Sequence, residues 1–130
     1  ILKHCKQVRL APPVIDPSAI IGDDVYIGAG SVICPNAILT TNISVGTCSS
    51  VNISSTIGHD CVIGDYFNVA PSANISGNVT IGNEVSVGTN ACIREKLSVS
   101  EKTIIGMGAV VTKNITEPGV YVGSPIKKIR

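Results

Sequence analysis

The sequence of 130 residues has no tryptophan, one phenylalanine, one methionine and only four leucines. Charged residues make up 15% of the chain, against about a quarter in an average globular protein. Because the net charge is only +1, the basic surface that binds a phosphate backbone is lacking, and nucleic acid is excluded as a partner. No run approaches the roughly 18 apolar residues of a membrane span, so a membrane is excluded as well.

What the sequence has in abundance is β-branched aliphatic residues, with 19 isoleucines and 16 valines. These side chains lose rotamer freedom in helices and pack well on pleated surfaces. The composition therefore excludes a helical bundle and predicts an all-β domain.

The five cysteines are an odd number, and they form no CxxC or zinc-ligand spacing. We therefore expect a reduced, cytoplasmic protein without a metal. The chain begins with Ile1, and its only methionine is Met107, so we expect it to be a piece of a longer product. His4 and Cys5 fall near this start, and we expect them to belong to a linker.

Aliphatic residues recur at every sixth position from Ile15 to Val111. All seventeen positions hold isoleucine, leucine or valine, and glycine directly follows eight of them. A period of six fits neither an α-helix nor simple strand alternation, but it suits a chain that runs a short strand, turns a corner and runs again. Three such faces make a triangular coil of 18 residues. The 102 residues of 15–116, divided by 18, give a parallel β-helix of between five and six coils.

The positions within each hexad have different expected tasks. The first aliphatic fills the interior, and the small or apolar residue four positions later lets the corner close. We expect the glycine to relieve the backbone where it bends. Residues 1–14 and 117–130 lie outside the register, and we expect them to form short caps at the two ends of the prism. The pattern does not give the hand of the helix, and general chirality rules favour right-handed crossovers.

The repeat resembles that of the hexapeptide-repeat acyltransferases, in which an aliphatic residue and glycine are followed by a small residue. The narrower similarity is to bacterial nucleotide-sugar and sialic-acid acetyltransferases of the NeuD and PglD type. It is carried by residues 55–71 (STIGHDCVIGDYFNVAP), 75–82 (ISGNVTIG), 106–113 (GMGAVVTK) and 122–127 (VGSPIK). The resemblance covers about residues 12–130 and implies a left-handed β-helix. In that group a Rossmann-like domain, absent from this sequence, precedes the β-helix and binds the sugar nucleotide.

His59 and Asp60 are the candidate catalytic residues. Transfer of an acetyl group to an amine or hydroxyl needs a base for the nucleophile's proton, and a neutral imidazole suits this task. A neighbouring carboxylate can hold the tautomer and stabilise the imidazolium. The resemblance implies that His59 is the base and Asp60 its acidic helper, where relatives often have glutamate. The alternative is a surface histidine at a turn. Cys61 is expected in the core, and no cysteine is expected to act as a nucleophile.

The resemblance also implies an acetyl-CoA site in a groove between neighbouring prisms. Relatives commonly have a second histidine at the position of Asn68, where it hydrogen-bonds the acetyl carbonyl. An asparagine can still donate through its amide, although it cannot carry a positive charge. The alternative is an asparagine that suits the geometry of a corner. The other residues implied in cofactor binding are Gly77, Thr89, Gly106, Met107, Gly108 and Lys113.

The glycines of this set equally fit hexad corners. Lys113, Lys127 and Lys128 are candidates for the phosphates of coenzyme A, or else they are solvated surface lysines.

These residues predict an acetyl-CoA-dependent acetyltransferase that acetylates an amino sugar, probable acceptors being nucleotide-linked, without an acyl-enzyme. The family implies a homotrimer with active sites between subunits. O-acetylation of a sugar hydroxyl uses the same parts, and a non-catalytic scaffold is favoured by Asn68 and by the missing sugar-binding domain. A zinc enzyme like γ-carbonic anhydrase is excluded, because it needs three histidine ligands and only His59 lies in the repeat.

Overall fold

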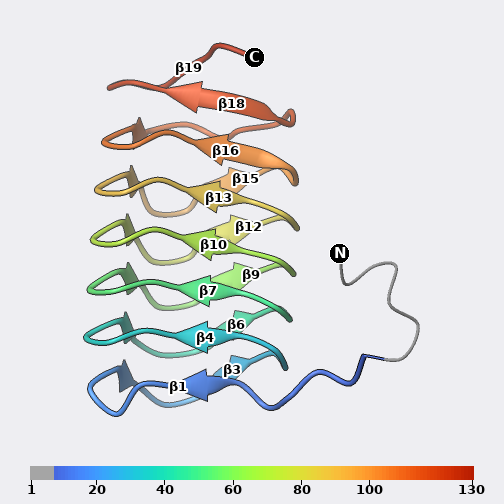
Figure 1. Ribbon diagram of the computed structural model, residues 1–130. Coiled ribbons are helices and arrows are strands. Elements are labelled where there is room, and N and C mark those ends of the chain that lie inside the picture. The colour runs from blue at the N-terminus through green and yellow to red at the C-terminus, as the bar shows by residue number, and fades with distance from the viewer. Residues whose placement is uncertain (1–7) are drawn as a thin grey trace.

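The computed structural model describes residues 8–130, which form three sheets wrapped into a triangular prism (Figure 1). Sheet A contains β1 (Val14–Ile15), β4 (Val32–Ile33), β7 (Ser50–Val51), β10 (Asn68–Val69), β13 (Ser86–Val87), β16 (Thr103–Ile105), β18 (Gly119–Val122) and β19 (Lys127–Lys128). Sheet B contains β2 (Ile20–Ile21), β5 (Ile38–Leu39), β8 (Thr56–Ile57), β11 (Asn74–Ile75), β14 (Cys92–Ile93) and β17 (Val110–Val111). Sheet C contains β3 (Val25–Ile27), β6 (Ile43–Val45), β9 (Val62–Ile63), β12 (Thr80–Ile81) and β15 (Ser98–Val99).

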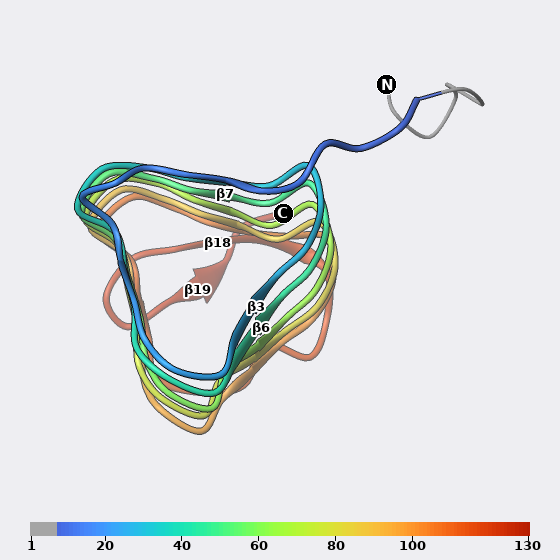
Figure 2. The ribbon, with the colours of Figure 1, turned by 90° about the horizontal axis from the view of Figure 1, so that it is seen from below.

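Successive coils pair in parallel with the spacing of 18 residues that the hexads predict. Val69 on β10, for example, is the partner of Val51 on β7 and of Val87 on β13. Seen from below, the chain turns anticlockwise as it moves away from the viewer, which makes the helix left-handed (Figure 2). The expected all-β, left-handed parallel β-helix is therefore confirmed, with the hand that the resemblance implied and not the one that general chirality rules favour.

The three corners of the prism run along its length as three edges. We call the corner between sheets A and B the A/B edge, the next the B/C edge, and the last the C/A edge. His59 and Gly77 lie on the B/C edge, because each falls between a strand of sheet B and one of sheet C. The position of a residue in its 18-residue coil thus decides which side of the molecule it occupies.

The interior is filled by the first aliphatic of each hexad, as predicted. From Ile33 to Val111 these residues are at most 3% exposed. The residue four positions later also points inward: it is small before sheet B, as at Ala73 and Ala91, but larger before sheet C, as at Leu97. Phe67, the one phenylalanine, is buried before sheet A. Burial of these side chains supplies the main driving force for folding.

The glycines that follow the aliphatics serve close packing between coils, and the expectation that they relieve a bend is wrong. A Cβ at Gly46 would lie 2.5 Å from the carbonyl carbon of Gly64 in the next coil. The left-handed backbone conformation occurs two residues further on, at positions such as Asp24, Asn42 and Asp60. Asparagine and aspartate tolerate this conformation better than most residues, which explains their frequency there.

The register shortens by two residues in the last coil. Ile115 pairs with Val99, a separation of 16, and it takes the buried place that the hexad would give to Glu117. β18 then continues sheet A beside β16, and β19 returns antiparallel to it. Ile126, between these two strands, is 4% exposed and covers the end of the core.

At the opposite end of the prism the first coil is more open, and Ile15 is 41% exposed. Within residues 8–130 there is no helix long and apolar enough to cross a membrane. His4 and Cys5 lie outside the described residues.

Candidate functional site

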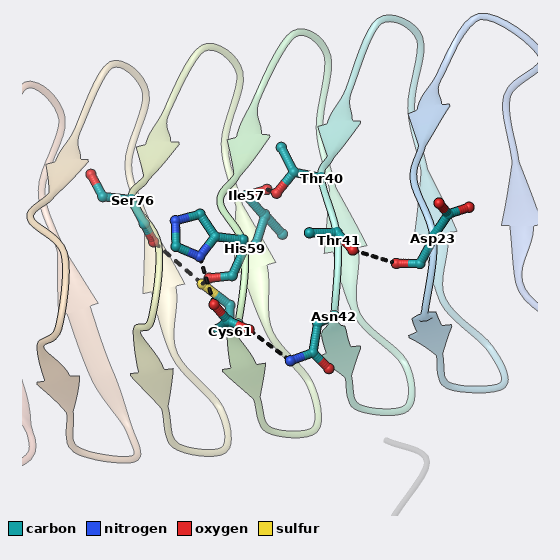
Figure 3. Close-up of polar contacts among 9 residues, drawn as sticks. Asp23, Thr40, Thr41, Asn42, Ile57, His59, Cys61 and Ser76 are labelled. Atoms are coloured by element: carbon teal, nitrogen blue, oxygen red, sulfur yellow. Dashed lines mark hydrogen bonds and ion pairs between the residues drawn. The ribbon is translucent and has the colours of Figure 1, made fainter.

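His59 and Asp60 stand together on the B/C edge, between β8 and β9 (Figure 3). The Nδ1 atom of His59 lies 2.6 Å from Oδ2 of Asp60. Both side chains are largely exposed, at 62% and 47%. When the neutral imidazole donates from Nδ1 to the carboxylate, its other nitrogen, Nε2, is left with a free lone pair. The pair can therefore accept a proton from a molecule that approaches the edge.

Asp60 is fixed by its backbone as well as by its partners. Its φ of 59° is left-handed, and its N–H donates to the carbonyl oxygen of Thr41 at 3.1 Å. The side-chain amide of Asn42 donates to Oδ1 of Asp60 at 2.7 Å. Hydrogen bonds from His59 and then from Asn42 lower the pKa of the Asp60 carboxyl below its ordinary value. The carboxylate is thus ionised at neutral pH.

Gly77 lies one coil above His59 on the same edge, and the imidazole rests against its backbone. A Cβ at residue 77 would be 2.5 Å from Nε2 and 2.7 Å from Cε1 of His59. The N–H of Gly77 has no acceptor among the described residues. The missing side chain makes room for the ring and leaves a backbone donor beside it.

Cys61 follows this pair but takes no part in its chemistry. Its side chain is buried, as expected for a core residue, and its thiol faces the carbonyl oxygen of Ser76 at 3.3 Å (Figure 3). Burial raises the pKa of the Cys61 thiol, which keeps it protonated.

Asn68 does not meet His59 within one chain. It is the first residue of β10 on sheet A, it is exposed, and its side-chain oxygen accepts a weak hydrogen bond from Asn52 at 3.4 Å. Sheet A faces away from the B/C edge, on the other side of the triangle (Figure 2).

The predicted cofactor residues fall into separate places. Thr89, Gly106, Met107 and Gly108 gather on the A/B edge, where the N–H of Gly108 donates to the carbonyl oxygen of Thr89 at 2.9 Å. Met107 is 81% exposed there. Gly77 shares the B/C edge with His59, as does Lys113 three coils above it. One chain thus carries the B/C group on one edge and the A/B group, with Asn68, on another side.

Lys113, Lys127 and Lys128 line a hollow of about 430 Å³ at the C-terminal end of the prism. Lys128 forms an ion pair with Glu117 at 2.9 Å, which raises the pKa of the lysine and lowers that of the glutamate. The hollow brings together the three lysines that the sequence left as separate candidates.

Two contributors escaped the analysis of the sequence. Asn42 lies 18 residues before Asp60, and Glu117 neutralises one of the three lysines. The spacing of one coil was the available indication for Asn42, because residues 18 apart are neighbours along an edge. No group of His, Cys, Asp and Glu suited to a metal ion occurs in residues 8–130.

Comparisons with known proteins point to sugar acetyltransferases. No protein-family model matches the sequence, and no curated protein matches it. Among solved structures, WeeI from Acinetobacter baumannii AYE is 40% identical, with a TM-score of 0.85 over 88% of this chain and 56% of that one. The acetyltransferase domain of PglB from Neisseria gonorrhoeae FA1090, in complex with acetyl coenzyme A, is 31% identical, with a TM-score of 0.89 over 92% and 58%.

A variant of perosamine N-acetyltransferase from Caulobacter crescentus, in complex with CoA and GDP-perosamine, has a TM-score of 0.90 at 22% identity, over 93% of this chain and 58% of that one. At this identity the likeness concerns the fold. The chain spans less than two thirds of the length of each of these three proteins. It is a left-handed β-helix domain of the hexapeptide-repeat acyltransferase type.

Proposed function

We propose that the chain transfers an acetyl group from acetyl-CoA to the amine of a sugar, and that the sugar is carried by a nucleotide. The observation that carries this proposal is the His59–Asp60 contact, with Nε2 of the ring beside the free N–H of Gly77. The PglB domain binds acetyl coenzyme A, and the perosamine enzyme binds CoA and GDP-perosamine. These neighbours support acetyl-CoA as the donor and an amino sugar as the acceptor.

In the proposed reaction the amine nitrogen attacks the thioester carbonyl carbon, while Nε2 of His59 takes the proton that the amine loses. A new C–N bond forms, the C–S bond breaks, and the CoA thiolate leaves and recovers the proton from the imidazolium. Asp60 stabilises that imidazolium through Nδ1. The N–H of Gly77 is placed to stabilise the oxyanion. No acyl-enzyme is needed.

We propose further that the active site is completed by a second copy of the chain in a cyclic homotrimer. His59 and Asn68 lie on different sides of one prism, so a site that contains both needs two copies. The B/C edge of one copy would face sheet A and the A/B edge of the next. In such a trimer the amide of Asn68 donates to the acetyl carbonyl, and Thr89, Gly106, Met107 and Gly108 line the path of the pantetheine arm.

Lys113, Lys127 and Lys128 are assigned to the phosphates of coenzyme A, because they surround one hollow. The four cysteines among the described residues are free, in keeping with the reduced cytoplasmic setting that we propose.

The test is an assay of acetyl transfer with purified protein, acetyl-CoA and a series of nucleotide-linked amino sugars, followed by release of the CoA thiol. Transfer to an amine by the wild-type chain is the expected result. Transfer only to a sugar hydroxyl would show an O-acetyltransferase. Acetyl-CoA that fails to bind to the folded protein in a calorimetric titration would contradict the proposal.

A non-catalytic scaffold is the second candidate, and one observation favours it: asparagine stands at position 68, where relatives commonly have histidine. Asn68→His tests this point. If residue 68 faces the acetyl group, the variant binds acetyl-CoA more tightly or turns over faster. No change in either would place Asn68 outside the site.

A further inference from the structure

We infer that Asn42 is a positioning residue for the candidate base, a role that rests on the proposed function. Its side-chain amide donates to Oδ1 of Asp60, and the other oxygen of that carboxylate meets Nδ1 of His59. The three side chains form one chain of hydrogen bonds from one coil to the next, visible in Figure 3.

Two short contacts hold the Asp60 carboxylate from opposite ends. The distance is 2.7 Å on the Asn42 side and 2.6 Å on the His59 side. An exposed aspartate held by one partner would rotate about its side-chain bonds, so the second contact selects the orientation in which Oδ2 faces the imidazole. Asn42 touches neither the ring nor the space above Gly77, and it acts through Asp60.

The geometry of Asn42 is set by its own backbone. Its φ of 52° is left-handed, and its N–H donates to the carbonyl oxygen of Asp23. Asn42 and Asp60 occupy equivalent positions of successive coils, 18 residues apart, so their side chains stand one above the other. An asparagine meets both needs of this position, because it tolerates the left-handed conformation and carries an N–H donor.

The donor matters for the proton on the imidazole. A fixed carboxylate at Nδ1 keeps the neutral ring protonated there, and Nε2 remains the acceptor that a general base requires. If Asp60 is released, the proton is shared between the two ring nitrogens, and a smaller fraction of molecules is ready to accept a proton at Nε2. We therefore expect an effect on the chemical step and little on acetyl-CoA binding.

The experiment compares the wild type with Asn42→Gly and Asn42→Asp. Glycine keeps the left-handed backbone without strain, and aspartate keeps the shape but replaces the donor by a carboxylate. We expect both variants to lower kcat on the order of tenfold while KM for acetyl-CoA stays within about twofold. The matched control is Asn36→Gly: Asn36 has a φ of 57°, lies on the A/B edge, and its side chain has no hydrogen-bond partner among the described residues.

The second readout is the nitrogen NMR spectrum of His59, which reports the tautomer whether or not the protein is active. A fall in the Nδ1-protonated fraction together with lower kcat supports the role of Asn42. An unchanged tautomer in Asn42→Gly overturns it, and so does a changed tautomer with unchanged kcat. If the wild type transfers no acetyl group, the proposed function fails on its own, and the tautomer still decides whether Asn42 positions His59.

Discussion

The C/A and B/C edges have the same backbone, but their corner side chains are used differently. On the C/A edge, Oδ1 of Asp65 accepts the N–H of Thr47 at 2.8 Å, and Oδ1 of Asn83 accepts the N–H of Asp65 at 2.8 Å. Each side chain thus satisfies a backbone donor of the coil before it. On the B/C edge, His59 turns instead to Asp60, and Gly77 has no side chain.

The difference shows how a repeat of this kind can carry a site without an insertion. A ladder of side chains stabilises the C/A edge and occupies its donors. Where the ladder is interrupted, a backbone N–H and an imidazole are left facing the outside of the prism. The same corner position therefore stabilises the fold on one edge and supplies candidate chemistry on the other.

The largest expected effect comes from His59→Ala. Acetyl transfer should fall by about 10²- to 10⁴-fold, the usual contribution of a general base, while thermal stability stays close to that of the wild type because the side chain is exposed. Turnover and melting temperature measured on the same preparation check this. Unchanged turnover would remove His59 from the mechanism.

Two glycine substitutions should separate the edges. Gly46→Ala places a Cβ against the backbone of the next coil on the C/A edge, and we expect a loss of about 1–3 kcal/mol in unfolding free energy. Gly77→Ala meets only the imidazole of His59, which can move away, so stability should change little. Transfer should instead fall on the order of 10²-fold, because the base is displaced.

Chemical denaturation and the transfer assay distinguish the two outcomes. If Gly77→Ala lost stability and kept its activity, as we expect of Gly46→Ala, the contrast between the edges would be wrong.

Asp65→Ala should affect stability alone. The substitution removes the acceptor for the N–H and hydroxyl of Thr47, and we expect a loss of about 1–2 kcal/mol in unfolding free energy. Acetyl transfer at a temperature well below the melting point should equal that of the wild type. A loss of activity in the folded variant would mean that the C/A edge also contributes to the site.

The smallest effect concerns the pH dependence of stability. Because hydrogen bonds lower the pKa of Asp60 in the folded chain, its carboxylate stabilises the fold above the ordinary value of about 3.9. That contribution is lost as the pH falls through the lower, folded value. The melting temperature of Asp60→Asn should therefore lie slightly below that of the wild type at pH 7 and approach it in acid. A difference that grows in acid would have the wrong sign.

The hexad predicted the fold closely, because a period of six residues leaves one arrangement that buries every aliphatic. It could not predict the role of the glycines, since Gly46 packs against Gly64 in a coil that the local sequence does not contain. It also missed the shortened last coil, where Ile115 replaces the expected position of Glu117.

The candidate site was predicted in part. His59 and Asp60 are neighbours in sequence, and their contact follows from that. The separation of nine residues between His59 and Asn68 is half of an 18-residue coil, so the repeat itself already indicated opposite sides. Asn42 needed a further step, namely that its corner lies directly below that of Asp60.

The central claim is that the His59 edge of one chain works against sheet A of another, and mixed oligomers test it most directly. His59→Ala lacks the base, and Asn68→Trp fills the facing side with an indole on an exposed strand position. Each variant alone should be inactive. In a trimer with shared sites, chains unfolded and refolded together at equal amounts should recover about one quarter of the wild-type activity, because every mixed trimer regains one of three sites. Recovery of none, with mixed oligomers present, would contradict the account.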